Sequence, residues 1–168
     1  MATMAAKRAA VVTLPTDTQI LITREFDAPK HLLYKAWTTP ELVMRWWSGR
    51  RGKMTLAEID LRVGGMWRYV MVANRGFEVA FHGEFREIVP NERIVTTEVY
   101  EGAPKDAPLS DEEALNIVRF IDVNGRTRLE LLVQTPSKEV RDVIVNSGME
   151  TGLQEQMEIL DELLQDLK

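Results

Sequence analysis

The chain has 168 residues, of which 45% are apolar and 28% charged, and it carries a net charge of −5. This length and composition are those of one ordinary globular domain with a core of its own. The acidic balance argues against a nucleic-acid-binding surface, and the absence of cysteine excludes disulfides and thiolate chemistry.

The N-terminal segment contains neither a secretory signal nor a membrane span. Lys7 and Arg8 lie in its middle, and no sustained apolar run follows them. We therefore expect residues 1–16 to be a flexible extension, followed by one domain over residues 17–168. We also expect no insertion into a membrane and a cytoplasmic location, with which the lack of cysteine is compatible.

A strand and two short helices are predicted next. Apolar and polar residues alternate over residues 18–27, a pattern typical of a half-buried strand. Asp27-Ala28-Pro29 and Thr39-Pro40-Glu41 each indicate a helix start, because proline is well tolerated in the first helical turn. Two short helices directly after a first strand would plug the mouth of a sheet rather than cover its face.

The second helix ends in a tryptophan pair, Trp46-Trp47. We expect one ring to anchor the helix in the core and the other to lie at the rim. Either both rings are purely structural, or one lines the entrance to a ligand site, where a rigid amphipathic ring is useful.

Four basic residues gather around this pair in an otherwise acidic protein: Arg45, Arg50, Arg51 and Lys53. They belong either to a solvated loop or to a rim that attracts an anion or a protein partner. The sequence leaves both interpretations open.

Six more strands are predicted after this loop. Their expected ranges are 56–61, 66–72, 77–85, 93–100, 114–123 and 126–134. Gly64-Gly65 and Asn124-Gly125 are hairpin signals, and residues 101–111 are rich in the residues that form loops. Consecutive strands joined by short turns predict an antiparallel sheet.

The inner face of this sheet is expected to be aromatic. Trp67 and Tyr69 lie on one face of their strand, and Phe81 lies on the next strand beside Gly83. A glycine among large inward side chains suggests a bend or a close approach.

The strand over residues 114–123 has two possible registers. In one, Asn116 faces inward together with Val118 and Phe120, as a polar group in an apolar interior. In the other, Leu115, Ile117 and Ile121 face inward instead. Both registers fit the residues equally well, because both faces carry large apolar side chains.

The C-terminal segment, residues 148–168, is predicted to be one long helix that organises the fold. Its apolar residues recur every three or four positions and so share one face. They are Met149, Leu153, Met157, Leu160, Leu163, Leu164 and Leu167. A helix of roughly 30 Å with such a stripe needs a large apolar partner, and a curved sheet wrapped around it supplies one. Gln156, near the middle of the stripe, is either bonded to backbone or water, or directed at a ligand.

The predicted fold is therefore α+β: a curved antiparallel sheet of about seven strands that grips a long C-terminal helix, with two short helices after the first strand. Such a grip commonly leaves an internal cavity between helix and sheet.

Several motifs resemble those of one known family, in the same order. They are Asp27-Ala28-Pro29, Ala36-Trp37-Thr38-Thr39-Pro40-Glu41, Trp46-Trp47, Glu58-Ile59-Asp60-Leu61-Arg62, Gly64-Gly65-Met66-Trp67, Gly83-Glu84-Phe85, Ile88-Val89-Pro90-Asn91-Glu92-Arg93 and Ser147-Gly148-Met149-Glu150. The chain is similar to the activators of the ninety-kilodalton heat-shock protein ATPase, within the START-like, birch-pollen-allergen-like (SRPBCC) superfamily of helix-grip domains. The resemblance runs from about residue 14 to the C-terminus. It implies the fold more specifically than the function, because these motifs are turns and core anchors rather than chemistry.

The sequence shows no arrangement typical of a metal site or a nucleophile. The two histidines, His31 and His82, are expected on a helix and on the outer face of a strand, without a second ligand at metal-binding spacing. Gly64-Gly65 lies between strands and does not open a helix, as a phosphate-binding loop would. We expect no metal, no cofactor and no catalytic residue.

The residues favour the non-catalytic binding of a hydrophobic or aromatic small molecule, such as a lipid, in a cavity between the terminal helix and the sheet. Gly152 is included in the site because its missing side chain leaves room beside the stripe. The expected lining is Trp46, Trp67, Tyr69, Phe81, Asn116, Val118, Leu129, Met149, Gly152 and Gln156.

Two other functions and a dimer remain open. The resemblance implies a stress-related co-chaperone that contacts a heat-shock ATPase, although the activators that gave the family its name carry a separate N-terminal chaperone-binding domain, which we do not expect here. Other relatives in the superfamily are cyclases or aromatases, which hold a reactive chain among a few polar groups. The candidates for these polar groups are Tyr69, Asn116, Gln156 and Arg128.

An exposed edge strand beside residues 101–111 could pair with a second copy and give a homodimer.

Overall fold

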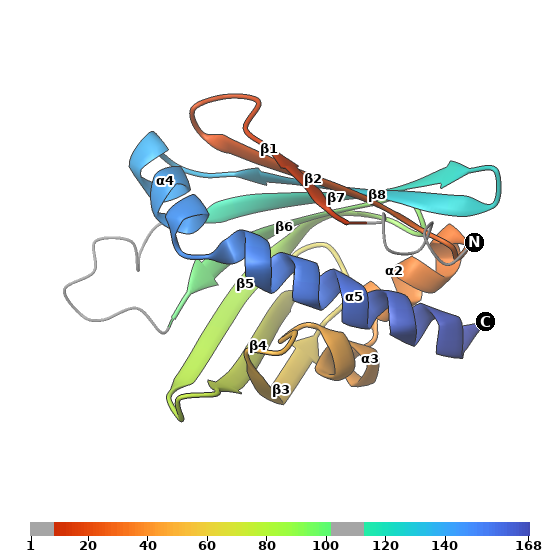
Figure 1. Cartoon of the computed structure of the whole chain (residues 1–168), viewed down its shortest axis with the longest axis horizontal. Coiled ribbons are helices and arrows are strands. Elements are labelled where there is room, and N and C mark those ends of the chain that lie inside the picture. Colours follow the sequence, from red (N-terminus) through yellow and green to blue (C-terminus); the bar gives the residue numbers. More distant parts are fainter. Residues whose placement is uncertain (1–8, 102–112) are drawn as a thin grey trace.

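The computed structural model describes residues 9–101 and 113–168, and it has the predicted α+β architecture (Figure 1). Eight strands form one antiparallel sheet, and a long helix crosses its concave side. The strands are β1 (Val11–Thr13), β2 (Gln19–Phe26), β3 (Gly52–Ile59), β4 (Met66–Ala73), β5 (Glu78–Val89), β6 (Arg93–Tyr100), β7 (Ala114–Val123) and β8 (Arg126–Gln134). The helices are α2 (Lys30–Thr38), α3 (Pro40–Trp46), α4 (Lys138–Asn146) and α5 (Met149–Leu167).

The strands lie in the order β1-β2-β8-β7-β6-β5-β4-β3, so β1 and β3 are the edges. All seven predicted strands are present, and β3 begins at Gly52, four residues before the predicted start at Leu56. The eighth strand, β1, pairs with β2 and lies within the segment that we expected to be a flexible extension. Three residues are too few to show an alternating pattern, which is why the sequence did not reveal β1. Residues 1–8 lie outside the described part of the chain.

The apolar stripe of α5 is the centre of the core, as predicted. Its side chains meet the inward residues of β2, β7 and β8, and the helix runs along the sheet in Figure 1. The buried members of the stripe are Leu153, Met157, Leu160, Leu163 and Leu164. Gly148 precedes the helix with a φ of 83°, a left-handed conformation that glycine adopts without a steric penalty.

The register of β7 is the one that turns Asn116 inward. Val118 and Phe120, which share its face, are 3% and 2% exposed and belong to the core. Leu115 and Ile117 lie on the opposite, outer face, where they are half-buried. The choice between two apolar faces is therefore made by the packing of α5 against only one of them.

The two short helices close one end of the grip. Leu33 of α2 and Val43 of α3 are fully buried. Trp46 anchors α3: its Nε1 donates a hydrogen bond to the Ala36 carbonyl oxygen at 3.0 Å, and its ring lies 4.7 Å from that of Trp37. Pro40 is the first residue of α3, where its missing N–H costs no helical hydrogen bond.

The basic residues around the tryptophan pair contact the acidic face of α5. Three ion pairs join them: Arg45–Asp166 at 3.5 Å, Arg50–Glu158 at 3.3 Å and Arg51–Glu155 at 3.7 Å. Exposed pairs of this kind contribute little individually. Together they fix the position of the loop after α3 on the helix, a role that neither interpretation of the sequence anticipated.

Candidate functional site

Aromatic side chains line up across three neighbouring strands on the concave face of the sheet. Tyr69 of β4 lies opposite Phe81 of β5, and Phe81 lies opposite Tyr100 of β6. The rings of Phe81 and Tyr100 are 4.9 Å apart. Trp47, which follows α3, packs edge-on against Tyr69 and Phe81 at 5.2 and 5.1 Å. We call Trp47, Tyr69, Phe81 and Tyr100 the aromatic row.

Trp67 extends this apolar wall and explains the inward glycine of β5. Its ring lies 4.7 Å from that of Tyr69, and its Nε1 donates a hydrogen bond to the Thr97 carbonyl oxygen at 3.1 Å. A Cβ on Gly83 would be 2.5 Å from that nitrogen and 1.8 Å from the Thr97 carbonyl oxygen. Gly83 is therefore required by a close approach, one of the two reasons that its position suggested.

A pair of polar side chains lies beside the aromatic row. Glu98 of β6 is two residues before Tyr100 and so faces the same side of the sheet. Asn116 Nδ2 donates a hydrogen bond to Glu98 Oε1 at 3.1 Å. Burial raises the pKa of the Glu98 carboxyl, and the hydrogen bond from Asn116 opposes that shift. We call Glu98 and Asn116 the polar pair.

The charge of Glu98 acts on the Tyr69 hydroxyl. Burial raises the pKa of Tyr69, and the negative charge of Glu98 raises it further. Tyr69 is only 8% exposed, and its hydroxyl makes no hydrogen bond within the described part of the chain. A hydroxyl that has no hydrogen-bond partner among the described residues is a group that a bound molecule can satisfy.

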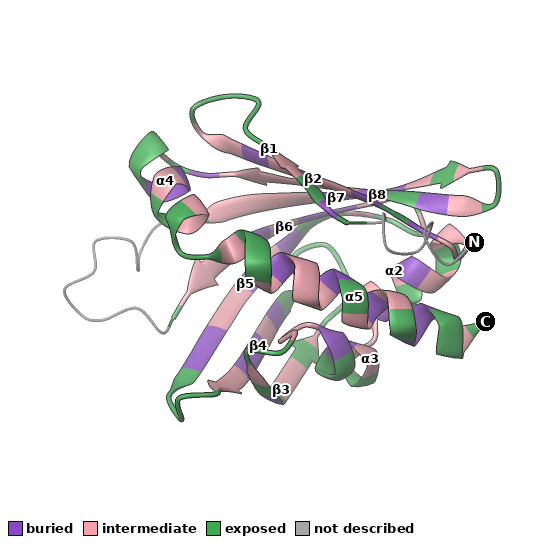
Figure 2. Ribbon diagram, viewed as in Figure 1, coloured by how far each residue is buried: buried purple, intermediate pink, exposed green. Residues whose placement is uncertain are grey.

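The inward side chains are packed less tightly here than at the other end of the core. Phe26, Phe120 and Leu160, which lie towards α2 and the C-terminal half of α5, are at most 2% exposed. Around the aromatic row and the polar pair Trp67 and Tyr69 are buried, but six other inward residues are half-buried, and the pink segments of β5 and β6 show this part of the sheet in Figure 2. The six residues are Phe81, Glu98, Tyr100, Leu131, Val133 and Met149.

The predicted site residues fall into three groups. Trp67, Tyr69, Phe81 and Asn116 come together with the aromatic row and the polar pair. Val118 and Leu129 are buried in the apolar surface under α5, and Met149, which is half-buried, is the first residue of α5 itself.

The third group, Trp46, Gly152 and Gln156, has structural contacts instead. Trp46 is a core anchor, and its neighbour Trp47 is the ring that contacts the aromatic row. Gln156 Nε2 donates a hydrogen bond to the Trp47 carbonyl oxygen, which is the backbone-bonded alternative. The open side of Gly152 is filled by the side chain of Arg51, because a Cβ there would be 2.9 Å from Arg51 Nε.

The expected lining omitted Glu98 and Tyr100, and from the tryptophan pair it named Trp46 rather than Trp47. The strand over residues 93–100 carries Ile94 and Val95 on opposite faces, and both are buried, so its pattern did not reveal which face is inward. The alternation of Ile94, Glu98 and Tyr100 on one face would have revealed an inward carboxyl once Ile94 was assigned to the core.

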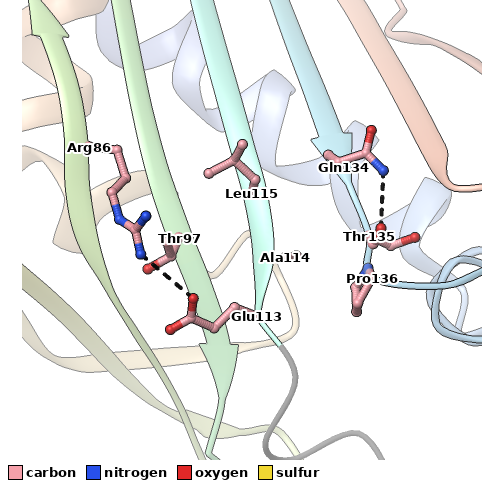
Figure 3. A pocket seen from close by; sticks show the side chains of 8 residues that line it. All are labelled: Arg86, Thr97, Glu113, Ala114, Leu115, Gln134, Thr135 and Pro136. Carbon is pink, nitrogen blue, oxygen red and sulfur yellow. Dashed lines mark hydrogen bonds and ion pairs between the residues drawn. The ribbon is translucent and has the colours of Figure 1, made fainter.

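A shallow hollow of about 230 Å³ lies on the outer face of the sheet (Figure 3). It is smaller than the ~300–1,000 Å³ of most ligand sites. Its lining residues are Arg86, Thr97, Glu113, Ala114, Leu115, Gln134, Thr135 and Pro136. The polar groups there are engaged: Arg86 is paired with Glu113 at 3.8 Å, and Gln134 Nε2 donates to the Thr18 hydroxyl at 2.8 Å. This hollow is a weaker candidate than the concave face.

Among the residues described, no group of three or more side chains is arranged to hold a metal ion. Within the same residues, no helix is long and apolar enough to cross a membrane. His82 lies on the outer face, where its Nδ1 is 2.8 Å from Glu101, which also accepts two hydrogen bonds from Arg68.

The curved sheet, the helix along its concave side and the partly open inner face define a helix-grip domain of the SRPBCC type. The model of the family described as "Activator of Hsp90 ATPase homolog 1-like protein" matches residues 27–165, so the chain belongs to this family. No curated protein matches the chain.

Solved structures of similar proteins share the whole fold. A crystal structure of a protein from Rhodobacter sphaeroides is 25% identical, with a TM-score of 0.85 over 94% of this chain and 99% of that one. A protein from Mycobacterium smegmatis is 24% identical, with a TM-score of 0.81 over 93% and 96%. A protein from Nitrosomonas europaea is 21% identical, with a TM-score of 0.78 over 91% and 97%. The similarity to the proteins from Mycobacterium smegmatis and Nitrosomonas europaea concerns the fold alone.

Proposed function

We propose that this protein binds a hydrophobic or aromatic small molecule between the N-terminal half of α5 and the concave face of the sheet, without catalysing a reaction. The single observation that carries the proposal is the contrast in burial along the core. Inward apolar side chains are closed off towards α2, whereas Phe81, Leu131 and Val133 are half-buried beside the polar pair. Apolar surface that faces the inside of a domain but stays accessible is typical of ligand sites.

The aromatic row supports this proposal. Large flat rings supply apolar area with few rotatable bonds, so a ligand is bound at a small entropic cost. Trp47 lies in the loop fixed on α5 by Arg50 and Arg51, which positions its ring over Tyr69 and Phe81 before any ligand arrives.

A substitution that fills the space tests the proposal. Val133→Phe adds an inward ring on β8, opposite Asn116, and we expect it to reduce the uptake of an anilinonaphthalene dye or a long-chain alcohol about tenfold. Leu132→Phe makes a similar change on the outer face of the same strand and is the matched control. Equal uptake by both variants and the parent would place the site elsewhere.

Native mass spectrometry of protein purified from its own host provides an independent test. We expect a small molecule to leave with the protein and to be lost in Val133→Phe but not in Leu132→Phe. A bound species that persists equally in both variants would argue against the concave face as its site.

The family description supports a second candidate, a co-chaperone that contacts a heat-shock ATPase. We expect no measurable acceleration of ATP hydrolysis by the host's chaperone at micromolar protein. A several-fold stimulation would favour the co-chaperone over ligand binding as the principal function.

A further inference from the structure

The carboxyl of Glu98 has no cationic partner among the residues described. Within the described residues its one hydrogen bond comes from the neutral amide of Asn116, and none of the basic side chains described there contributes to its electrostatic surroundings. Other carboxylates of the chain are paired: Glu101 with Arg68, and Asp161 with Arg24. An ionised carboxyl that faces the interior without a counter-charge is costly, so Glu98 is either protonated or paired with a cation, and a bound molecule can supply that cation.

The groups around Glu98 are those that recognise an ammonium ion. Phe81 and Tyr100, whose rings lie 4.9 Å apart, face the same side of the sheet as Glu98, and Trp47 packs on the same row. Aromatic rings attract cations through their negatively polarised faces, most strongly where water is excluded. An ammonium group has three donors and no acceptor, so it requires oxygen acceptors in its site.

In the part of the chain that the structure describes, two such acceptors lie on the concave face and neither is paired with a cation. One is the Glu98 carboxylate, whose second oxygen is not engaged by Asn116. The other is the Tyr69 hydroxyl, which has no hydrogen-bond partner in the described ranges and whose pKa is raised by the charge of Glu98 as well as by burial. A carboxylate ligand would instead meet the like charge of Glu98 and could not donate to its second oxygen.

We propose that the ligand is an apolar, ring-bearing amine, whose protonated nitrogen binds Glu98 and whose ring lies against the aromatic row. This inference rests on the proposed binding function and specifies its ligand class. It assigns Glu98 as the residue that selects for charge, with Tyr69 and Asn116 positioned beside it.

Three naphthalene probes of the same size test this selectivity on the full chain. They are 1-naphthylmethylamine, 1-naphthalenemethanol and 1-naphthoic acid, titrated by calorimetry at neutral pH. We expect the amine to bind about tenfold more tightly than the alcohol, which corresponds to ~1.4 kcal/mol, and the acid to bind most weakly. This comparison on the parent protein needs no variant.

The variant Glu98→Gln keeps the shape and removes the charge. We expect it to lose the tenfold preference for the amine, so that the amine and the alcohol bind this variant with affinities within about twofold of each other. Glu84→Gln makes the same change on the outer face of β5 and should keep the preference. Circular dichroism of each variant verifies the fold.

The outcomes separate the two levels of the proposal. If the alcohol binds and the amine shows no advantage, or if Glu98→Gln keeps the preference, the ligand class is wrong and the binding function stands. Tighter binding of the acid than of the amine would also overturn the ligand class. If none of the three probes nor the anilinonaphthalene dye binds, both the ligand class and the proposed function fail.

Discussion

Arg51 occupies the space that Gly152 leaves open on α5. A Cβ on Gly152 would be 2.9 Å from Arg51 Nε and 3.2 Å from its Cζ, and the same guanidinium donates a hydrogen bond to the Gly148 carbonyl oxygen at 2.9 Å. The two residues are 101 positions apart in the sequence, so this contact joins the loop after α3 to the start of the terminal helix. The glycine therefore accommodates a side chain of the protein itself rather than a ligand.

Gly152→Ala should change the free energy of unfolding by less than ~1 kcal/mol. Alanine gains roughly 0.8–1 kcal/mol of helix propensity over glycine, whereas displacing Arg51 loses an exposed ion pair worth about 0–1 kcal/mol. The two effects nearly cancel because the guanidinium is the flexible end of a half-exposed side chain. Urea denaturation measures the difference.

We expect Gly152→Leu to leave the uptake of hydrophobic probes unchanged, because it displaces only Arg51 while the Arg50–Glu158 ion pair still holds the loop that carries Trp47. Arg51→Met is the matched control, because it removes the ion pair without altering the helix. A loss of probe binding in Gly152→Leu alone would return Gly152 to the ligand site.

Leu160 is the residue on which the stability of the grip depends most directly. It is 0% exposed in the middle of the α5 stripe, so Leu160→Ala removes buried methyl groups and leaves a cavity. We expect a loss of ~2–5 kcal/mol in the free energy of unfolding. Glu162→Ala, on the exposed face of the same helix, should change it by less than ~0.5 kcal/mol. Comparable losses in the two variants would contradict the burial of the stripe.

The fold was predictable because its elements carry strong local patterns. The three-and-four spacing of α5 and the hairpin signals at Gly64-Gly65 and Asn124-Gly125 depend only on neighbouring residues. Strand β1 lacks such a pattern, because three residues paired to β2 are defined by the partner strand. The family motifs add the order of the elements but no chemistry.

The candidate site was predictable only in part, because its decisive contacts join distant segments. The aromatic residues Trp67, Tyr69 and Phe81 were identified from alternation alone. The inward carboxyl of Glu98 depends on which face of β6 meets α5, and both faces of that strand are apolar at Ile94 and Val95. Local patterns cannot decide between two faces of similar hydrophobicity, so the structure was needed to find Glu98.

Glu101 should stabilise the folded protein above the ordinary titration range of carboxyl groups. Hydrogen bonds from Arg68, and then from His82, lower the pKa of Glu101 in the folded state. The folded state then binds fewer protons than the unfolded state as the pH falls, so this stabilisation is lost at low pH. Glu101→Gln should unfold more readily than the parent at neutral pH and show a shallower loss of melting temperature on acidification. Identical acid profiles would exclude this contribution.

Glu98 should show the opposite pH dependence, because burial raises rather than lowers its pKa. Between the ordinary pKa of a glutamate and the raised pKa in the folded protein, the folded state holds a proton that the unfolded state has already released. The free energy of unfolding therefore falls as the pH rises through that window. Glu98→Gln removes the ionisation while the amide can still accept a hydrogen bond from Asn116. We expect the variant to be more stable than the parent above the window and to differ little below it, as measured by urea denaturation across pH.

Tyr69→Phe is the control, because it removes the hydroxyl whose pKa the charge of Glu98 raises and should retain the fall in stability with pH. If Glu98→Gln is instead less stable than the parent at every pH, the carboxylate is held by a favourable charge in the folded state. An amine that binds at Glu98 supplies such a charge. Saturating 1-naphthylmethylamine should therefore reduce the fall in stability with pH in the parent and leave the pH dependence of the stability of Glu98→Gln unchanged.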